Sequence, residues 1–397
     1  MEKLAIDGGT PVRTKPFPEW PVFGDLEERL ILEVVRSGKW GGTGRVKLPE
    51  LEEKFAAIHD AKHAVTVVNG TLAITVALQA AGVEPGDEVI MPPYTFIATA
   101  SSALLFGAIP VFVDVEPDTL LIDPEKVEAA ITPKTKAIVA VHIAGAPANL
   151  TRLKEIAAKH GLSLIEDSAQ AVGAKWDGVG VGAQGDFGTF SFQSSKNINS
   201  GEGGIILTNN ERLADMAWSI ANVGRVRQGG WYQHERIGWN LRMTEFQAAI
   251  LLAQLTRLEE QMATRERNAK LLTELLNDID GVRTLRRHPK ATRHAYHLYM
   301  FALDSALADR VEKSDVIRKL NAEGIPVSAG YVSLNQNKAI IKETKKWLGE
   351  ERVYSCPVSE RACDKEILWL AQNVLLGSEE DMHDIAKAVR KVIASYR

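Results

Sequence analysis

Short apolar runs rich in β-branched residues recur along the first half of the chain and most strongly constrain its fold. They cover residues 64–68, 88–91, 110–113, 136–141, 163–167, 189–193 and 204–207. Because the runs lack polar alternation, they are typical of strands buried on both faces. Helical patterns between them, such as 71–81 and 150–160, indicate βαβ crossovers. The sequence therefore predicts an α/β fold with a mainly parallel sheet covered by helices.

The segments around this pattern predict the domain organisation. Residues 1–24 include four prolines between positions 11 and 21 and are expected to form an extended N-terminal arm. A helical pattern over 25–37 follows, and a second covers 49–59. A long helical pattern over 244–276 leads into the remainder, where we expect a strand at 296–303 and helices at 314–323 and 379–395. We place a large α/β domain at 25–264 and a smaller C-terminal α+β domain at 265–397.

Composition excludes several classes of partner. Lysine and arginine number 47 against 51 aspartate and glutamate, so the net charge of −4 gives no broad attraction to nucleic acid or to anionic membranes. The two cysteines, Cys356 and Cys363, are too few for a disulfide framework or a zinc site. The first residues contain charge and glycine before any long apolar run, which predicts a cytoplasmic protein without a signal peptide.

Two segments that follow expected strands carry polar groups suited to a ligand. Ligands of such sheets collect at the carboxyl ends of the strands. Asn69, Gly70 and Thr71 come where a strand ends and a helix begins, which suits a phosphate, although Asn and Thr are also ordinary helix caps. Asp167 ends another run. Its carboxylate can hold a heterocyclic nitrogen in the protonated state, or it can serve only as a turn or cap aspartate.

Lys196 follows a third expected strand and leads into a glycine-rich segment at 200–204. A lysine beside a cationic or desolvated site has a lowered pKa and can attack a carbonyl as a free amine. Most lysines are solvated surface residues. The small and polar neighbours of Lys196, and glycines that leave space for a bulky adduct, favour the reactive interpretation.

Two further patterns are more typical of structural features than of binding sites. The glycines between 180 and 185 match the spacing of a dinucleotide-binding loop, but they precede a strand instead of following one, so we expect an ordinary loop. His288, His294 and His297 lack metal-ligand spacing and are expected to be structural, so no metal site is predicted.

Five short motifs, taken in order, resemble the DegT-type sugar aminotransferases. The motifs are Asn69-Gly70-Thr71, residues 92–99, residues 166–170, residues 190–196 and residues 238–242. The resemblance covers nearly the whole chain and implies the fold of aspartate aminotransferase, which is fold type I of enzymes that use pyridoxal 5'-phosphate. It also implies a large domain that holds this cofactor and a smaller C-terminal domain.

The resemblance assigns roles around the cofactor ring. Lys196 matches the lysine that forms the Schiff base, and Asp167 matches the partner of the pyridine nitrogen. Gln170 falls where the family contacts the phenolic oxygen of the cofactor. Phe96 matches the aromatic residue that lies against the ring, with Tyr94 as the nearby alternative.

The resemblance also assigns the phosphate ligands. Gly70, Thr71 and Ser191 match residues that bind the cofactor phosphate within one chain. Asn240 matches a residue that reaches the phosphate from the other subunit. A homodimer with shared active sites is therefore implied.

Several details are similar to one branch of the family. The chain has Ile143-Ala144-Gly145 and residues 193–195 where branches that act on nucleotide-linked sugars often have other sequences. With the Trp20-Pro21 pair and the loop at 201–204, these features resemble the branch of glutamine:scyllo-inosose aminotransferases and 3-amino-5-hydroxybenzoate synthase. This branch implies a role in aminoglycoside biosynthesis.

The resulting hypothesis is transfer of an amino group from glutamine or glutamate to a keto-cyclitol or keto-sugar through Lys196. Tyr94, Arg242, Tyr331 and Asn335 are the candidates for binding the substrate. A nucleotide-linked keto-sugar is the alternative acceptor. The rival hypotheses are a sugar dehydratase, which carries histidine in place of the lysine, and a non-enzymatic regulator that binds the cofactor.

Overall fold

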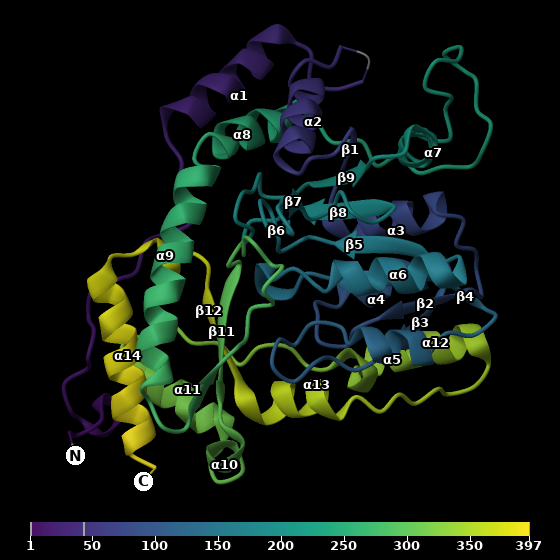
Figure 1. The fold of residues 1–397 in the computed structure, drawn as a ribbon. Coiled ribbons are helices and arrows are strands. Elements are labelled where there is room, and N and C mark those ends of the chain that lie inside the picture. The colour runs from purple at the N-terminus through teal and green to yellow at the C-terminus, as the bar shows by residue number, and fades with distance from the viewer. Residues whose placement is uncertain (1, 43, 397) are drawn as a thin grey trace.

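The computed structural model describes residues 2–42 and 44–396, and its largest element is a seven-stranded sheet (Figure 1). The strand order is β1-β9-β8-β5-β4-β2-β3. Neighbouring strands from β3 to β8 are parallel, whereas β9 is antiparallel to β8 and to β1. The prediction of a mainly parallel sheet is therefore confirmed. The strands are β1 (His63–Val67), β2 (Glu88–Met91), β3 (Ile109–Phe112), β4 (Thr135–Val141), β5 (Ser163–Asp167), β8 (Phe187–Ser191) and β9 (Gly204–Thr208).

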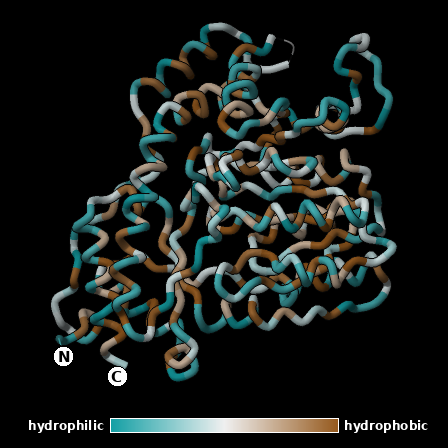
Figure 2. The backbone as a smooth tube through the Cα atoms, viewed as in Figure 1, coloured by the Kyte–Doolittle hydropathy of each residue, from teal (hydrophilic) through white to brown (hydrophobic). Residues whose placement is uncertain are grey.

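Helices cover both faces of this sheet (Figure 1). One face is covered by α3, with α4 and α7 packed beside it, and the other by α6 with α5. Figure 2 shows hydrophobic segments running through the strands, while hydrophobic and hydrophilic segments alternate along the surrounding helices. The bounds are α3 (Gly70–Ala80), α4 (Ala98–Leu104), α5 (Pro124–Ala129), α6 (Leu150–His160) and α7 (Glu211–Ala221).

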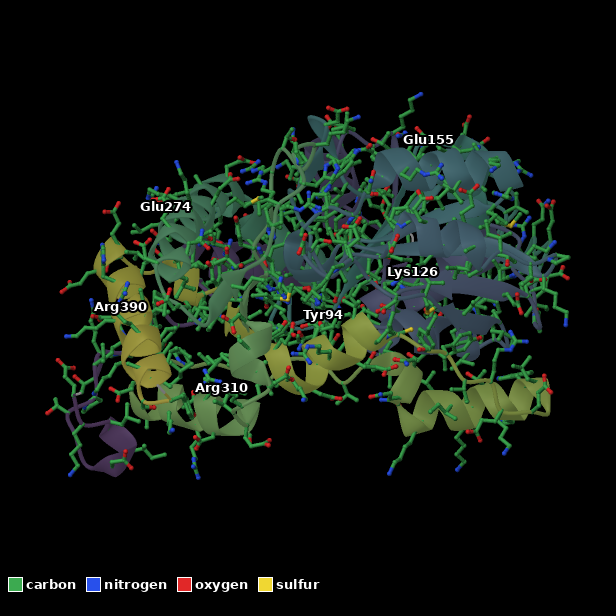
Figure 3. All side chains as sticks on the ribbon, turned by 60° about the horizontal axis from the view of Figure 1, so that its bottom comes forward. Tyr94, Lys126, Glu155, Glu274, Arg310 and Arg390 are labelled. Atoms are coloured by element: carbon green, nitrogen blue, oxygen red, sulfur yellow. The ribbon has the colours of Figure 1, made fainter. Side chains whose placement is uncertain are left out.

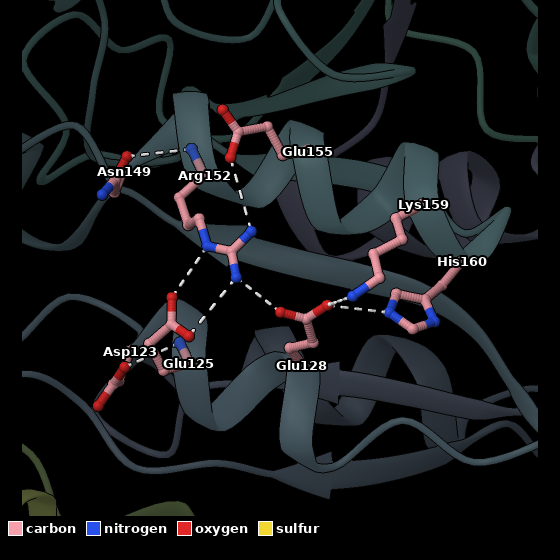
Figure 4. Close-up of polar contacts among 8 residues, drawn as sticks. All are labelled: Asp123, Glu125, Glu128, Asn149, Arg152, Glu155, Lys159 and His160. Atoms are coloured by element: carbon pink, nitrogen blue, oxygen red, sulfur yellow. Dashed lines mark hydrogen bonds and ion pairs between the residues drawn. The ribbon is translucent and has the colours of Figure 1, made fainter.

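Polar side chains cap the starts of α5 and α6 and also connect the two helices at the surface. The Asn149 side chain accepts the N–H of Arg152 at the start of α6, and Asp123 accepts the N–H of Glu125 at the start of α5. The guanidinium of Arg152 then donates to Glu125 at 2.9 Å and to Glu128 at 2.6 Å (Figure 4). Exposed ion pairs stabilise little, so the buried faces of the two helices hold them in place.

The predicted helix over 244–276 is wrong as a single element, because it is divided into α8 (Glu245–Leu255) and α9 (Leu258–Asn277). At the break, Thr256 and Arg257 donate their N–H groups three residues back instead of four. Glu27 of helix α1 (Asp25–Ser37) accepts hydrogen bonds from the Arg257 side chain there. Each helix keeps an apolar face, so periodicity alone cannot reveal the break. The N-terminal helices are α1 (Asp25–Ser37), as predicted, and α2 (Lys47–Ile58).

A second, antiparallel sheet lies in the C-terminal part of the chain, with the order β10-β11-β12. Its strands are β10 (Val282–Thr284), β11 (Leu298–Leu303) and β12 (Ile367–Ala371). The helices near it are α10 (Ser305–Ala308), α11 (Lys313–Ala322), α13 (Pro357–Arg361) and α14 (Glu379–Ala394), whereas α12 (Lys338–Leu348) packs against α4 and β3 of the large sheet. A two-stranded ribbon, β6 (Lys175–Trp176) with β7 (Val179–Gly180), completes the strands of the described residues.

Two hydrophobic cores underlie these sheets. The helix α9 contributes to both, because Leu258 and Met262 belong to the core of the large sheet, whereas Leu272 and Leu276 belong to the C-terminal core. One continuous helix thus joins the two parts. The division of the chain at 1–24, 25–264 and 265–397 stays a prediction.

The residues before α1 form an arm that is held along the C-terminal part of the chain (Figure 1). Buried Arg13 donates to Asp381 at 2.7 Å and to Asp384 at 2.9 Å, both on α14. Among the described arm residues, a single turn at Ala5–Asp7 is the only helix. The arm then crosses to the large sheet, where Trp20 Nε1 donates to the carbonyl of Ser194 at 3.1 Å.

Candidate active site

A cavity of about 900 Å³ opens at the carboxyl ends of β5 and β8. Its walls come from the large sheet, from the arm and from the C-terminal part of the chain. The structure brings together eight of the residues singled out from the sequence: Gly70, Thr71, Phe96, Asp167, Gln170, Ser191, Lys196 and Tyr331. Residues far apart in the chain therefore share one site, while their individual roles stay predictions.

One end of the cavity is built to receive an anion. It lies at the N-terminus of α3, where Asn69 accepts the N–H of Leu72 and thereby caps the helix. The side chains of Thr71 and Ser191 line the cavity beside these first helical residues. A Cβ atom on Gly70 would lie 2.7 Å from Cβ of Ser191, so only glycine fits here. Helix N–H groups and two hydroxyls around a close backbone approach suit a phosphate.

We predict that Gly70→Ala destabilises the fold and weakens binding of a phosphorylated ligand. The added methyl must push Ser191 away, and overpacking of this kind costs about 1–3 kcal/mol. Chemical denaturation measures the loss of unfolding free energy. Gly41→Ala is the control, because a Cβ at Gly41 meets no atom within 4 Å. Equal stability of the two variants would contradict the close contact.

Asp167 forms the floor of the cavity at the end of β5. Its Oδ2 accepts from the hydroxyl of Thr99 at 2.8 Å, and its Oδ1 accepts from the N–H of Ala169 at 3.2 Å. Burial raises the pKa of Asp167, while these two hydrogen bonds and the charge of Lys196 oppose the rise. A cation placed beside this carboxylate would therefore be held strongly.

Lys196 faces Asp167 across the cavity as an unusually acidic lysine. Burial lowers the pKa of its ammonium group to about 8, and the charge of Asp167 only partly opposes this change. At pH 7 roughly a tenth of such a lysine is the neutral amine, far more than for an ordinary lysine. Its Nζ has no hydrogen-bond partner among the described residues, so the nucleophile is free to react.

Gln170 and Tyr331 form the wall beside Asp167. The Nε2 of Gln170 donates to the Tyr331 hydroxyl at 2.7 Å, and its Oε1 accepts the N–H of Ala144 at 2.7 Å. Both ends of the amide are therefore fixed. The Tyr331 hydroxyl, which accepts from Gln170, keeps its own proton for a ligand, and burial raises the pKa of Tyr331.

Two candidates for binding the substrate are buried away from the cavity. Tyr94, labelled in Figure 3, is fully buried, and its hydroxyl accepts from Trp369 Nε1 at 3.1 Å. Asn335 is bound by the C-terminal part itself, since its Nδ2 donates to the carbonyl of Tyr354 and to Glu360. A residue's sequence position near a motif does not fix which way its side chain points. Neither residue lines this cavity, and their roles stay predictions.

Asn240 and Arg242 also lie outside this cavity, in the segment between α7 and α8. Asn240 is exposed and forms an isolated bridge with Asn222. Arg242 donates to Asn222 at 2.8 Å and lines a separate, smaller cavity of about 390 Å³. The segment between α7 and α8 projects from the body of the chain (Figure 1). Neither Asn240 nor Arg242 lines the 900 Å³ cavity.

The structure adds lining residues that sequence reasoning missed, namely Trp20, Thr99, His297, Gln372 and Asn373. The sequence predicts only a structural role for His297, yet the residue lies in the cavity wall, where its Nδ1 is 3.1 Å from Oδ1 of Asn197. Burial holds the pKa of His297 well below its ordinary value, so the ring stays neutral. Thr99 ends the motif at 92–99 and is detectable from it, whereas Gln372 and Asn373 follow β12 without any motif.

Gly182 and Gly185 lie in a loop before β8, as predicted, whereas Gly180 ends β7. The backbone N–H groups of Gly182, Gln184 and Gly185 donate to the carboxylate of Glu166 at 2.6–2.8 Å. The same carboxylate lies 3.0 Å from His142 Nε2. The loop therefore binds a buried carboxylate of its own chain instead of a dinucleotide.

Comparisons with known proteins agree with this geometry. Residues 23–390 match the DegT/DnrJ/EryC1/StrS aminotransferase family. An L-glutamine:2-deoxy-scyllo-inosose aminotransferase from Streptomyces kanamyceticus is 41% identical over 98% of this chain and 97% of its own. A 3-amino-5-hydroxybenzoate synthase from Amycolatopsis mediterranei is 37% identical over 95% of this chain and 97% of its own. The crystal structure of 3-amino-5-hydroxybenzoic acid synthase has a TM-score of 0.88 at 34% identity, covering 96% of this chain and 99% of that one.

The fold and the site define an aminotransferase with the architecture of aspartate aminotransferase. The chain belongs to the DegT/DnrJ/EryC1/StrS aminotransferase family. The predictions of family, fold class and enzyme class are thereby confirmed.

Membrane spans and metal clusters are both absent from residues 2–42 and 44–396. No helix there has the length and apolar character needed to cross a membrane. Within the same residues, no group of three or more His, Cys, Asp or Glu side chains is arranged to hold a metal ion.

Proposed function

We propose that the cavity binds pyridoxal 5'-phosphate and that the enzyme transfers an amino group from glutamine or glutamate to a keto-cyclitol or keto-sugar. When bound, this cofactor supplies a pyridinium ring that accepts electrons as a bond next to nitrogen breaks. The observation that carries the proposal is the convergence of Lys196, Asp167 and the Gly70 anion site on one cavity. We further propose that the enzyme works in the cytoplasm.

The residues present fit this cofactor. The N-terminus of α3, with the hydroxyls of Thr71 and Ser191, suits its phosphate. Asp167 can keep its ring nitrogen protonated, because a cation beside a buried carboxylate is strongly favoured. Phe96, which is 56% exposed and lines the cavity, offers an aromatic face to the ring.

Lys196 has two tasks in this proposal. Its neutral Nζ would hold the cofactor as a nucleophilic amine, which is why a lowered pKa is useful. Nζ would also act as the general base that takes a proton from Cα of the donor and, in the second half-reaction, as the general acid that gives a proton to the acceptor carbon.

The substrate class follows from the relatives and from the cavity wall. The name of the Streptomyces kanamyceticus relative gives glutamine as donor and an inosose as acceptor, and the name of the Amycolatopsis mediterranei relative gives an aminated ring as product. A ring rich in hydroxyl groups needs hydrogen-bond partners, and the Tyr331 hydroxyl has its proton available beside Gln170. We therefore favour a free keto-cyclitol over a nucleotide-linked sugar.

The test is the visible absorbance of the protein loaded with pyridoxal 5'-phosphate. Addition of glutamine should shift this absorbance, and a keto-cyclitol added afterwards should restore it. A panel of keto-cyclitols and nucleotide-linked keto-sugars then identifies the acceptor. No spectral change with either glutamine or glutamate would refute the proposal and would favour a cofactor-binding regulator.

We also propose that the enzyme is a homodimer in which Asn240 reaches the cofactor phosphate of the partner subunit. Asn240 does not line the cavity of its own chain. The segment that carries it exposes large apolar side chains, with Trp231 76%, Tyr232 79% and Ile237 98% exposed. Exposed apolar groups gathered on one projecting segment are typical of an interface.

Mixing two damaged variants tests the shared site. A single amide donor to a charged phosphate contributes about 1.5–3 kcal/mol, so Asn240→Ala should weaken cofactor binding by roughly ten- to a hundredfold. In a mixed dimer of Lys196→Ala and Asn240→Ala chains, both lesions fall in one site and the other site is intact. Mixing should therefore restore some activity. If mixing restores none, Asn240 serves its own chain and the shared-site proposal fails.

A further inference from the structure

Gln372 presents an unused pair of hydrogen-bond donors to the cavity. It follows β12, lines the cavity and is 2% exposed. Its Oε1 accepts from Arg265 Nε at 3.0 Å and also from Arg265 Nη2. The two Arg265 groups that point at this amide are both N–H donors and need an oxygen as acceptor. The Gln372 Oε1 therefore faces Arg265, and the amide NH₂ group faces away from it. No acceptor among the described residues receives a hydrogen bond from this Nε2.

Arg265 is a buried positive charge without a counter-charge. Its side chain, on α9, is fully buried, and no described carboxylate forms an ion pair with it. Its Nη1 has no hydrogen-bond partner within the described residues. Burial lowers the pKa of Arg265 to about 9, so the guanidinium is still charged at neutral pH. An unpaired buried charge is costly, and an anion that binds nearby reduces the cost.

The surroundings of this pair are preorganised. The ring of Trp20 lies against the guanidinium, with its centroid 5.4 Å from Cζ of Arg265. Asn373, the next lining residue, donates to the carbonyl of Pro18 at 2.7 Å and so ties the arm to the end of β12. These groups come from the arm and the C-terminal part, whereas the anion site at Gly70 belongs to the large sheet. The cavity therefore has a second electropositive wall.

We propose that Gln372 binds the carboxylate of the amino-acid donor through its amide N–H groups. Arg265 is a positioning residue that fixes the direction of this amide and places a positive charge behind it. A hydroxyl group of the acceptor ring could accept the same hydrogen bonds, but the uncompensated charge of Arg265 favours an anion. This donor subsite rests on the proposed aminotransferase function and adds the recognition of its first substrate.

Gln372→Glu tests the subsite with a side chain of the same shape. Glutamate keeps a contact with Arg265 but replaces the amide donors with an oxygen that repels carboxylates. The probes are glutaramate, which is glutamine without its amino group, and its uncharged analogue glutaramide. Calorimetry on the cofactor-loaded protein measures their affinities. The wild type should bind glutaramate about tenfold or more tightly than glutaramide, and Gln372→Glu should lose this preference through weaker glutaramate binding.

Gln336→Glu is the matched control. Gln336 is exposed and ends a short turn at Leu334–Gln336, and it does not line the cavity. This variant should keep its glutaramate affinity within about threefold of the wild type. An equal loss in both variants, or unchanged affinity in Gln372→Glu, would overturn the subsite.

A second variant keeps the test valid if Gln372→Glu does not fold. Gln372→Leu removes the donors without adding charge, and it should also weaken glutaramate while leaving glutaramide unchanged. Unchanged glutaramate affinity in a folded Gln372→Leu protein would likewise overturn the subsite.

The response of the wild type to glutamine distinguishes failure of the subsite from failure of the proposed function. If glutamine leaves the visible absorbance of the wild type unaltered, the proposed function itself fails, whatever the variants bind.

Discussion

Lys196→Ala should fold normally and still bind pyridoxal 5'-phosphate, yet lose turnover by about a thousandfold or more. The change removes the amine that bonds to the cofactor and also the group that moves the proton, and each of these contributions is large. Lys196 is the only lysine among the described residues that line the cavity, so no second amine is at hand. The rate of amino transfer from glutamine, measured under saturating cofactor, gives the result.

Lys154→Ala is the control for this prediction. Lys154 is exposed on α6, so its loss should leave turnover unchanged. Thermal unfolding of both variants checks that they are folded. A turnover of Lys196→Ala within about tenfold of the wild type would refute the proposed mechanism.

Asp167→Asn should be nearly as damaging, with a loss of about a hundredfold or more in turnover. Asparagine has the same shape, and its amide oxygen can still accept from Thr99, so the fold should be retained. A neutral amide, however, cannot keep a ring nitrogen protonated. Turnover with glutamine and the visible spectrum of the bound cofactor are the measurements.

Asp186, which directly precedes β8, provides the control. Asp186 accepts the N–H of Leu164 at 2.9 Å and has a purely structural contact. Asp186→Asn should therefore cost some stability and leave turnover unchanged. If Asp167→Asn kept near-normal turnover, Asp167 would be only a structural cap.

The large sheet was predictable because its strands are short apolar runs that differ clearly from the helices between them. The bounds of β2 and β5 agree with the expected 88–91 and 163–167. The break between α8 and α9 was not predictable, because it depends on Glu27, far away in the sequence, holding Arg257. Local sequence patterns determine which segments form helices and strands, whereas tertiary contacts determine where a helix is interrupted.

The cavity residues also divide into those that local sequence patterns predict and those that depend on tertiary contacts. Lys196 and Asp167 follow strands, and a parallel sheet brings such positions to one edge. No motif in the sequence around Gln372 marks it as a binding residue. Its proposed role depends on Arg265, more than a hundred residues earlier, which donates to its side-chain oxygen. Asn335 illustrates the opposite case, because it is close in sequence to the lining residue Tyr331 but its amide donates to Tyr354 and Glu360 in the C-terminal part of the chain.

The arm has a consequence for the order in which the enzyme is assembled. Trp20 forms part of the cavity wall, but the arm that carries it is held by Arg13, whose partners are Asp381 and Asp384. The two aspartates are synthesised 368 and 371 residues after Arg13, at roughly 5–20 residues per second, so the large sheet has time to fold before they appear. The arm must therefore wait for α14, and the wall at Trp20 is among the final parts of the cavity to form.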